Sequence, residues 1–504
     1  MVRFPFSLAT PPAFAGPFPA VADVVVIGGG VVGVTTALFL RRRGLSVVLL
    51  EKGRIAAEQS SRNWGWIRQQ GRDRDELPIM VESRRLWQQL AAEAGEDIGL
   101  TQGGVAYLAR GPRDMQAFAE WLPNAAAHGL DTRLLDADET AALIPGCTPA
   151  ATGGLVTPSD LRAEPWLAVP ALARLAAREG VIIAEGCAAR RLDRAAGRVA
   201  GVLTEAGRVA APAVVLAGGA WSSLFLRAHG VAIPQLSVRA TVAATEALPQ
   251  VWTGGAADDR IAFRRRADGG YTLAIGGAHD LWIGPDAFRA LPRYVPQLRA
   301  HPLGTRFRLA APARWPDAWG TPRTWAADEE SPFERLRILD PAPNAGDVER
   351  ARARFAALFP ALGAVRLRAA WAGMIDTMPD VVPVIDACAA LPGLWIGTGL
   401  SGHGFGIGPG VGRVLAALVA GVAPGHDLAR FRLSRFLRRQ PHPPRPRAVT
   451  APRPDMPDAG WAQPRDIIKM DIEAAEQRAL TGARGTIEAA TPKLQICRYH
   501  TGFG

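Results

Sequence analysis

The chain has 504 residues, which is enough for two domains with sizeable cores. Its formal net charge is +11, but from Arg430 onward 14 basic residues stand against 7 acidic ones, so +7 of that charge belongs to the last segment. The charge of the remaining body is unremarkable for its size, which argues against a nucleic-acid-binding protein. The four cysteines are scattered without metal-ligand spacing, which predicts a reducing compartment and no metal site.

The first 20 residues form a predicted N-terminal arm. Prolines interrupt its apolar residues too often for a signal-peptide core. No run in the chain approaches the roughly 18 apolar residues of a membrane span. We therefore expect a cytoplasmic protein, with peripheral association with a membrane as an alternative.

Residues 23–52 predict a βαβ unit that binds the ADP half of a dinucleotide. The unit contains, in order, strand Val24–Ile27, the glycines Gly28, Gly30 and Gly33, helix Val31–Arg43, the helix-ending Gly44, strand Ser46–Leu50, Glu51 and Lys52. The G-x-G-x-x-G spacing allows a sharp turn, close approach of the pyrophosphate and packing of helix on strand. The acid is placed to accept hydrogen bonds from the adenosine ribose, and it would repel a 2′-phosphate.

A polar loop follows the second strand, at the edge of the sheet where doubly wound folds bind ligands. Its cofactor-binding candidates are Ser60, Ser61, Arg62, Asn63 and Trp64. Hydroxyl and backbone N–H groups suit a pyrophosphate, and the arginine would neutralise its charge. The two indoles of the loop, Trp64 and Trp66, are placed to flank an aromatic ring. The alternative is a surface loop with two half-buried indoles.

The opening unit followed by S-S-R-N-x-G resembles the FAD-dependent amine and D-amino-acid oxidoreductases, the glycine-oxidase and sarcosine-oxidase superfamily. The resemblance implies an α/β fold in which a Rossmann-like FAD-binding domain is interrupted by an α+β substrate domain with an antiparallel sheet. It assigns residues 21–100, 151–235 and 365–430 to the FAD-binding domain, and residues 101–150 and 236–364 to the substrate domain.

Two later segments carry the same resemblance. Gly153–Pro165, then a helix and Val181–Ile183, are similar to the family's return to its FAD domain, and Ala210–Ser222 is similar to its second glycine turn. The resemblance implies that small residues there let backbone approach the cofactor. The cofactor-binding candidates of these segments are Ala189, Ala217, Gly218 and Trp221.

The predicted substrate domain contains strand-like runs. These are Val105–Ala109, Ala240–Thr245 and Ile261–Ile275, the last with a hairpin turn at Asp268–Gly270. In Ile261–Arg266 alternate side chains point to opposite faces, so Phe263 shares a face with Arg265, and Arg264 shares the other face with Arg266. We expect one face to roof the flavin and the other to be solvated, without deciding which.

A second glycine-rich motif lies at 394–421. Gly397, Gly399 and Gly402 also match G-x-G-x-x-G, but no acid follows about twenty residues on, so NAD binding is rejected. The better interpretation is a strand, a glycine loop and a helix that begins near Pro409. The resemblance implies that the positive helix N-terminus faces the N1–C2=O edge of the flavin. The cofactor-binding candidates here are Gly399, Gly402, His403, Gly404, Phe405 and Gly406.

Residues 366–386 resemble the family's approach to the flavin ring. Some relatives attach flavin covalently through a cysteine here or through a histidine in the early loop. This chain has neither, and Gly373, another cofactor-binding candidate, stands in the first of these regions. We therefore predict non-covalent, dissociable FAD.

The C-terminal part changes in character. Residues 431–465 predict a proline- and arginine-rich linker. Residues 466–504 resemble the middle of FkbM-like S-adenosylmethionine methyltransferases, but Ala474 replaces the usual glycine and the glycine-rich cofactor turn is absent. We interpret this segment as an inactive remnant.

The sequence thus predicts a flavoprotein that oxidises the C–N bond of a D-amino acid, an N-alkyl glycine or an opine by hydride transfer to flavin N5. Arg68 is the first candidate to anchor a substrate carboxylate and Arg265 the second, with a surface charge as the alternative for each. His403 is a candidate to face flavin or substrate, or else bonds to backbone. Oxidation of a C–O bond, or an FAD-binding subunit of a larger complex, are the alternatives. The electron acceptor is either oxygen or a quinone or carrier.

Overall fold

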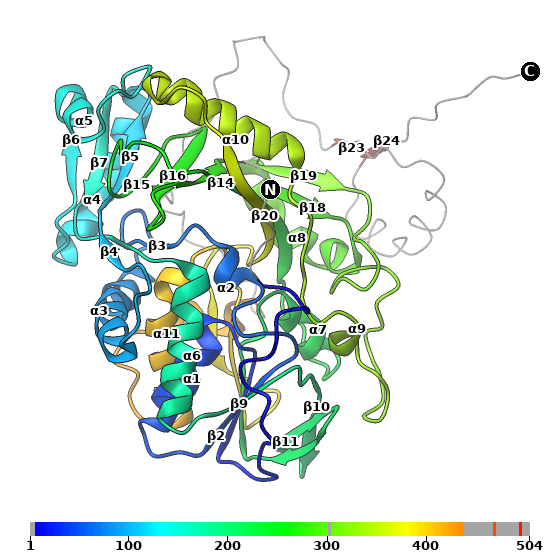
Figure 1. The fold of residues 1–504 in the computed structure, drawn as a ribbon. Helices are drawn as coiled ribbons and strands as arrows, with labels where there is room; N and C mark the ends of the chain where they lie inside the picture. The colour runs from blue at the N-terminus through cyan, green and yellow to red at the C-terminus, as the bar shows by residue number, and fades with distance from the viewer. Residues whose placement is uncertain (1–5, 278, 301–303, 437–466, 470–492, 496–504) are drawn as a thin grey trace, which may run out of the picture.

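The computed structural model describes residues 6–277, 279–300, 304–436, 467–469 and 493–495 (Figure 1). A six-stranded sheet lies at its centre in the order β21-β22-β13-β1-β2-β9, with only β21 antiparallel to its neighbour. The strands are β1 Val24–Ile27, β2 Val47–Glu51, β9 Ile182–Glu185, β13 Ala213–Leu216, β21 Val384–Ala387 and β22 Leu394–Thr398. Both faces of this sheet are covered, so each has its own hydrophobic core. Val24 and Val26 pack into the core on one face, and Val25 packs into the core on the other.

Four helices cover one face of this sheet (Figure 1). They are α1 Val31–Arg41, α3 Leu77–Ala94, α6 Pro165–Arg178 and α11 Gly404–Val419, and they pack on one another. The other face is covered by a three-stranded sheet and short helices around Trp221. These are β10 Ala189–Ala195, β11 Arg198–Thr204, β12 Gly207–Ala210, η1 Gly219–Trp221, α7 Ser222–Arg227 and α9 Pro332–Arg335. The predicted βαβ unit is confirmed, with its helix ending two residues earlier than expected.

A ten-stranded, mainly antiparallel sheet lies beside the first. Its strands are β5 Val105–Ala109, β6 Arg133–Leu135, β7 Gly153–Thr157, β14 Leu236–Thr245, β15 Gly255–Ala257, β16 Ile261–Arg265, β17 Tyr271–Ile275, β18 His279–Trp282, β19 Thr305–Arg308 and β20 Leu367–Thr377. The predicted hairpin is confirmed as β16 and β17. Two of these strands, β7 and β20, come from segments that the prediction gave to the FAD-binding domain. The domain boundaries themselves stay a prediction.

The remaining elements connect and flank the two sheets. A small sheet, in the order β3-β8-β4, consists of β3 Trp66–Ile67, β8 Leu161–Arg162 and β4 Thr101–Gln102. The other elements are α2 Gln59–Arg62, α4 Pro112–Ala127, α5 Ala137–Leu143, α8 Pro285–Ala300, α10 Ala345–Leu358, η2 Pro360–Leu362, η3 Ala429–Phe431, η4 Leu433–Phe436 and the parallel pair β23 Ile467–Lys469 and β24 Lys493–Gln495.

The prediction that one face of Ile261–Arg266 is solvated is wrong. Phe263 is buried against Phe355 of α10, with ring centres 5.5 Å apart. On the opposite face Arg264 and Arg266 are also buried, 1% and 3% exposed. A helix covers the first face, and ion pairs on the second offset part of the cost of burying the guanidinium groups.

The prediction that a helix begins near Pro409 is also wrong, because α11 begins at Gly404 with the proline inside it. A proline inside a helix removes one N–H and frees a carbonyl four residues earlier. Side chains of α3 satisfy the freed groups: the Trp87 indole donates to the carbonyl of Phe405 at 3.2 Å. Ser83 Oγ donates to the Gly406 carbonyl and accepts from the Gly410 N–H, bridging the break.

Candidate cofactor and active site

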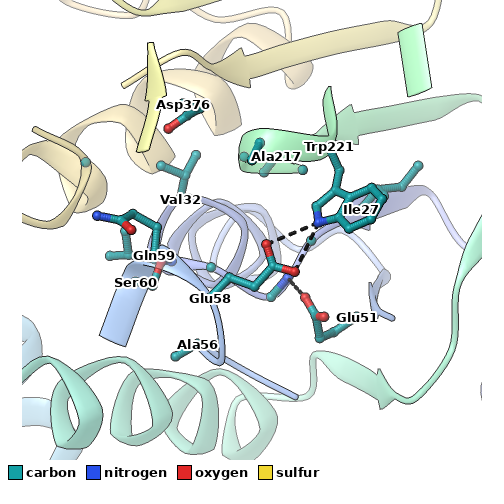
Figure 2. Close-up of a pocket in the computed structure, with 18 of the residues that line it drawn as sticks. Ile27, Val32, Glu51, Ala56, Glu58, Gln59, Ser60, Ala217, Trp221 and Asp376 are labelled. Atoms are coloured by element: carbon teal, nitrogen blue, oxygen red, sulfur yellow. Dashed lines mark hydrogen bonds between the residues drawn. The ribbon is translucent and has the colours of Figure 1, made fainter. Parts of the chain in front are cut away.

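A cavity opens at the carboxyl ends of β1, β2 and β13, the edge where doubly wound folds bind dinucleotides. Its empty space, open mouth included, is about 1210 Å³. Figure 2 shows the side chains that surround it. The predicted cofactor residues in its wall are Gly28, Gly30, Glu51, Lys52, Ser60, Asn63, Ala189, Ala217, Gly218, Trp221, Gly402, Gly404 and Phe405.

The glycines of the first turn are required by close backbone contacts. Gly28 has φ +110°, and a Cβ there would lie 2.4 Å from the Ala217 carbonyl oxygen. A Cβ on Gly33 would lie 1.9 Å from the Gly28 carbonyl oxygen, so only glycine lets α1 pack this closely on β1. Ser60 Oγ accepts from the Val31 N–H at 2.9 Å and thus reaches the N-terminus of α1.

Two acids stand at one end of the cavity. Glu51 accepts hydrogen bonds from the N–H groups of Gly29 and Gly53, both at 2.7 Å, while burial raises its pKa. Glu58 accepts from the Trp221 indole at 3.0 Å (Figure 2). It also pairs with Lys52 at 2.7 Å. The sequence analysis missed Glu58, because nothing in its local pattern separates it from an ordinary loop acid.

At the other end the wall includes three residues that the sequence analysis also missed, Gln59, Met374 and Asp376. In Figure 2, Gln59 and Asp376 both lie on the side of the view away from Glu51 and Trp221. Asp376 Oδ2 accepts from the Gly399 N–H at 2.7 Å, and burial raises the pKa of this carboxyl to about 6. Gln59 Oε1 is buried and has no hydrogen-bond partner among the described residues.

Several predicted cofactor residues do not line the cavity. They are Gly33, Ser61, Arg62, Trp64, Gly373, Gly399, His403 and Gly406. Arg62 is buried, where it donates to the carbonyls of Ala57 and Ala372 and pairs with Asp340. Others support the wall from behind: a Cβ on Gly373 would lie 2.2 Å from Gln59 Oε1.

His403 is the residue that caps the N-terminus of α11, between two glycines of the cavity wall. Its Nδ1 lies 3.3 Å from Oε2 of the fully buried Glu76. Burial lowers the pKa of His403 well below its usual value, as do the charges of Arg72 and Arg68. Burial also raises the pKa of Glu76 to about 7. The imidazole is therefore neutral near neutral pH, and Nδ1 either donates to the Glu76 carboxylate or accepts from its protonated carboxyl.

Arg68 is half-buried beside the start of α11. Its guanidinium carbon lies 5.8 Å from the ring centre of Trp66 and 5.3 Å from that of Tyr107. Among the described residues no acid forms an ion pair with Arg68, and its buried Nη1 has no hydrogen-bond partner. Burial, together with the charge of Arg72, lowers its pKa to about 9. A positive charge of this kind suits an anionic ligand.

Arg265 and Arg264 lie on opposite faces of β16. Arg265 lies on the face of Phe263, where it stacks over Tyr271 and donates to the Leu248 carbonyl. Arg264 lies against the polar loop that follows β2, since a Cβ added to Gly65 of that loop would be 3.1 Å from Arg264 Nε. Its charge is neutralised by Glu164, which it contacts twice at 2.9 Å. Of the two arginines predicted to anchor a substrate carboxylate, only Arg68 is therefore beside the polar loop that follows β2.

A glycine-rich cavity at the carboxyl edge of a parallel sheet, with residues of a second sheet in its wall, defines a dinucleotide-binding protein. The sequence profile of the FAD dependent oxidoreductase family matches residues 23–418. Human mitochondrial sarcosine dehydrogenase is 25% identical over 83% of this chain and 42% of that protein. The D-amino acid dehydrogenase of Rhizobium johnstonii is 26% identical over 71% of this chain and 74% of that protein.

Among solved structures, L-amino acid deaminase from Proteus myxofaciens in complex with anthranilate is similar, with a TM-score of 0.80 and 30% identity. The match covers 84% of this chain and 95% of that chain. The chain belongs to the FAD dependent oxidoreductase family. The match to sarcosine dehydrogenase spans less than half the length of that protein.

FAD is the cofactor of this family, and the cavity fits it. Glycine stands where backbone must approach a pyrophosphate, and the buried Gln59 oxygen still needs a donor. In the described residues, none of the helices combines the length and the apolar character that crossing a bilayer requires. The comparisons do not support the predicted methyltransferase resemblance of residues 466–504. Most of these residues lie outside the described part of the chain, as does the predicted linker from residue 437 onward.

Proposed function

We propose that this chain oxidises the C–N bond of an amino acid or secondary amine. The observation that carries the proposal is Arg68, a half-buried cation without an acid partner among the described residues, beside the first turn of α11. A Cβ on Gly406, in that turn, would lie 3.2 Å from the Trp66 carbonyl oxygen and 3.4 Å from the Arg68 N–H nitrogen. An arginine there suits a substrate carboxylate through its bidentate fork.

The cavity residues have separate roles in the proposal. The backbone at Gly28 and Gly30 would hold the pyrophosphate, and Glu51 would accept hydrogen bonds from the ribose hydroxyls. The N–H groups at the start of α11, near Gly404, would stabilise negative charge on the flavin ring. When bound, FAD supplies the electron acceptor and takes a hydride at N5. No covalent attachment is proposed, in keeping with Gly373 in place of a cysteine.

His403 orients the substrate amine in this proposal. In the form in which its Nδ1–H donates to Glu76, Nε2 is left as the acceptor for an N–H of the amine. Because Glu76 has a pKa of about 7, it can also take up a proton that the histidine passes on. The amine then reacts in its unprotonated form, and Arg68 holds the carboxylate that fixes its orientation.

The test is Arg68→Ala in the FAD-loaded enzyme. Loss of the carboxylate anchor is expected to raise KM by the equivalent of about 2–4 kcal/mol, roughly thirtyfold to several hundredfold. Arg85→Ala is the matched control, because Arg85 lies on the exposed side of α3. An unchanged KM for a carboxylate substrate would remove Arg68 from the site.

A second candidate function is that of an FAD-binding subunit within a larger dehydrogenase. It is favoured by similarity to sarcosine oxidase subunit beta of Arthrobacter, which is 24% identical over 82% of this chain and 91% of that protein. Flavin that no amine reduces in the isolated chain, but that is reduced once a co-purified partner is present, would select this candidate.

A further inference from the structure

Arg162 is a buried arginine without an acid partner among the described residues. It lies in β8, the central strand of the small sheet, and is 9% exposed. Its Nε donates to the Thr253 carbonyl at 2.9 Å, whereas Nη1 is buried and has no hydrogen-bond partner. A buried cationic donor left unpaired is costly, so a site of this kind is expected to receive an acceptor.

Glu164, the acid whose charge acts on Arg162, is already in use. Both carboxylate oxygens of Glu164 accept from Arg264, at 2.9 Å each, and one also accepts from the Ala267 N–H at 2.8 Å. One negative charge thus meets one positive charge, and Arg162 has no ion-pair partner of its own in the described residues. Burial lowers the pKa of Arg162 to about 10, and the charge of Arg264 contributes to this shift.

Trp66 presents a second unpaired donor on the same side of the sheet. It lies directly opposite Arg162 in the antiparallel pairing of β3 and β8, so both side chains leave the same face. Its indole Nε1 is buried and has no partner among the described residues. A Cβ on Gly255 would lie 2.4 Å from that nitrogen, so this glycine makes room for the indole.

Arg68 and Arg162 belong to two different groups of charges. The guanidinium of Arg68 lies over the Trp66 ring, and the neighbours that shift its pKa are Arg72, Asp160 and Glu76. The neighbours that shift the pKa of Arg162 are Arg264, Glu164, Arg265 and Tyr271. The two cations therefore stand among different charged neighbours, Arg68 over the Trp66 ring and Arg162 directly opposite Trp66 in the strand pairing.

We propose that Arg162 and the indole N–H of Trp66 bind a second carboxylate of the substrate. The substrate class is then an amino acid with an acidic side chain or an acidic N-substituent. The inference rests on the proposed amine oxidation, in which Arg68 holds the first carboxylate. The apolar part of the substrate, between its two carboxylates, would pack against the indole.

The test compares ligands that differ only in the second carboxylate. Anaerobic flavin reduction by glutamate is measured against glutamine, and by aspartate against asparagine, with both enantiomers of each. Arg162→Gln and Arg162→Lys are compared with wild-type enzyme of equal FAD content. Calorimetry with glutarate and with butyrate measures binding without turnover.

We expect wild-type enzyme to prefer the acidic member of a pair by about tenfold or more in kcat/KM, and Arg162→Gln to abolish that preference. Arg162→Lys should keep part of it, and the neutral member should react alike in all forms. Glutarate should bind about tenfold more weakly to Arg162→Gln, with butyrate unchanged. Equal use of acid and amide by wild-type enzyme would overturn the inference without any variant, leaving Arg162 with a buried water only.

The two proposals fail differently. If no amine reduces the flavin, the proposed oxidation is wrong, and glutarate binding alone then decides whether Arg162 binds an anion. If amines reduce the flavin but glutarate binds wild-type and Arg162→Gln equally, the oxidation stands and the second carboxylate is wrong.

Discussion

Replacing Gly33 by alanine tests how α1 and β1 hold the cofactor turn. An added Cβ would lie 1.9 Å from the Gly28 carbonyl oxygen, where real Cβ contacts below 3.0 Å essentially do not occur. The oxygen belongs to the turn itself and cannot rotate away as a flexible side chain would. Alanine gains about 0.5–1 kcal/mol over glycine inside a helix, but overpacking costs about 1–3 kcal/mol or more.

We therefore expect Gly33→Ala to lower the melting temperature by a few degrees and to weaken FAD binding by about tenfold, since Gly28 lines the cavity. Flavin absorbance per protein and thermal unfolding of holoenzyme measure the two effects. Gly320→Ala is the control, because a Cβ there meets nothing within 4 Å and its φ is not positive. Normal FAD content and stability in Gly33→Ala would refute the packing described for α1 and β1.

Three further predictions concern α3, α11 and the cofactor. Ser83→Ala removes the hydroxyl that bridges the helix break at Pro409. It should lower the unfolding free energy, measured by urea titration, by about 1–3 kcal/mol. An unchanged unfolding free energy would mean that water replaces the hydroxyl. Burial raises the pKa of Glu76 from 4.5 to about 7, so the stability that protonated Glu76 contributes is lost as pH rises through this range. The unfolding free energy of wild type relative to that of Glu76→Gln should therefore fall between these two pH values. A difference in unfolding free energy that does not change with pH would contradict the assignment. Acid precipitation should release the flavin into the supernatant, and a yellow pellet would show covalent attachment.

The sequence was sufficient for the features that depend on local pattern. The order of strand, glycines, helix, strand and acid at 23–52 specifies both the βαβ unit and the edge where its ligand binds. The β16–β17 hairpin followed from alternation and a glycine turn. These patterns are fixed by short-range geometry, so they do not depend on the rest of the chain.

Other features depended on contacts that are distant in sequence. Pro409 predicted a helix start, but Ser83 and Trp87 of another helix satisfy the backbone groups that it frees. Adjacent arginines of one strand point to opposite faces, and alternation alone did not tell which face the early loop covers. Asp376 enters the cavity through the pairing of β20 with β14, which no local pattern announces.

The most direct measurement is an anaerobic absorbance scan of the purified protein with D-amino acids, N-methyl amino acids, opines and 2-hydroxy acids. We expect a bound flavin whose absorbance is bleached by an amine substrate and not by the hydroxy acids. A flavin that only hydroxy acids bleach would contradict the proposed C–N oxidation. Protein that carries no flavin would contradict the cofactor cavity itself.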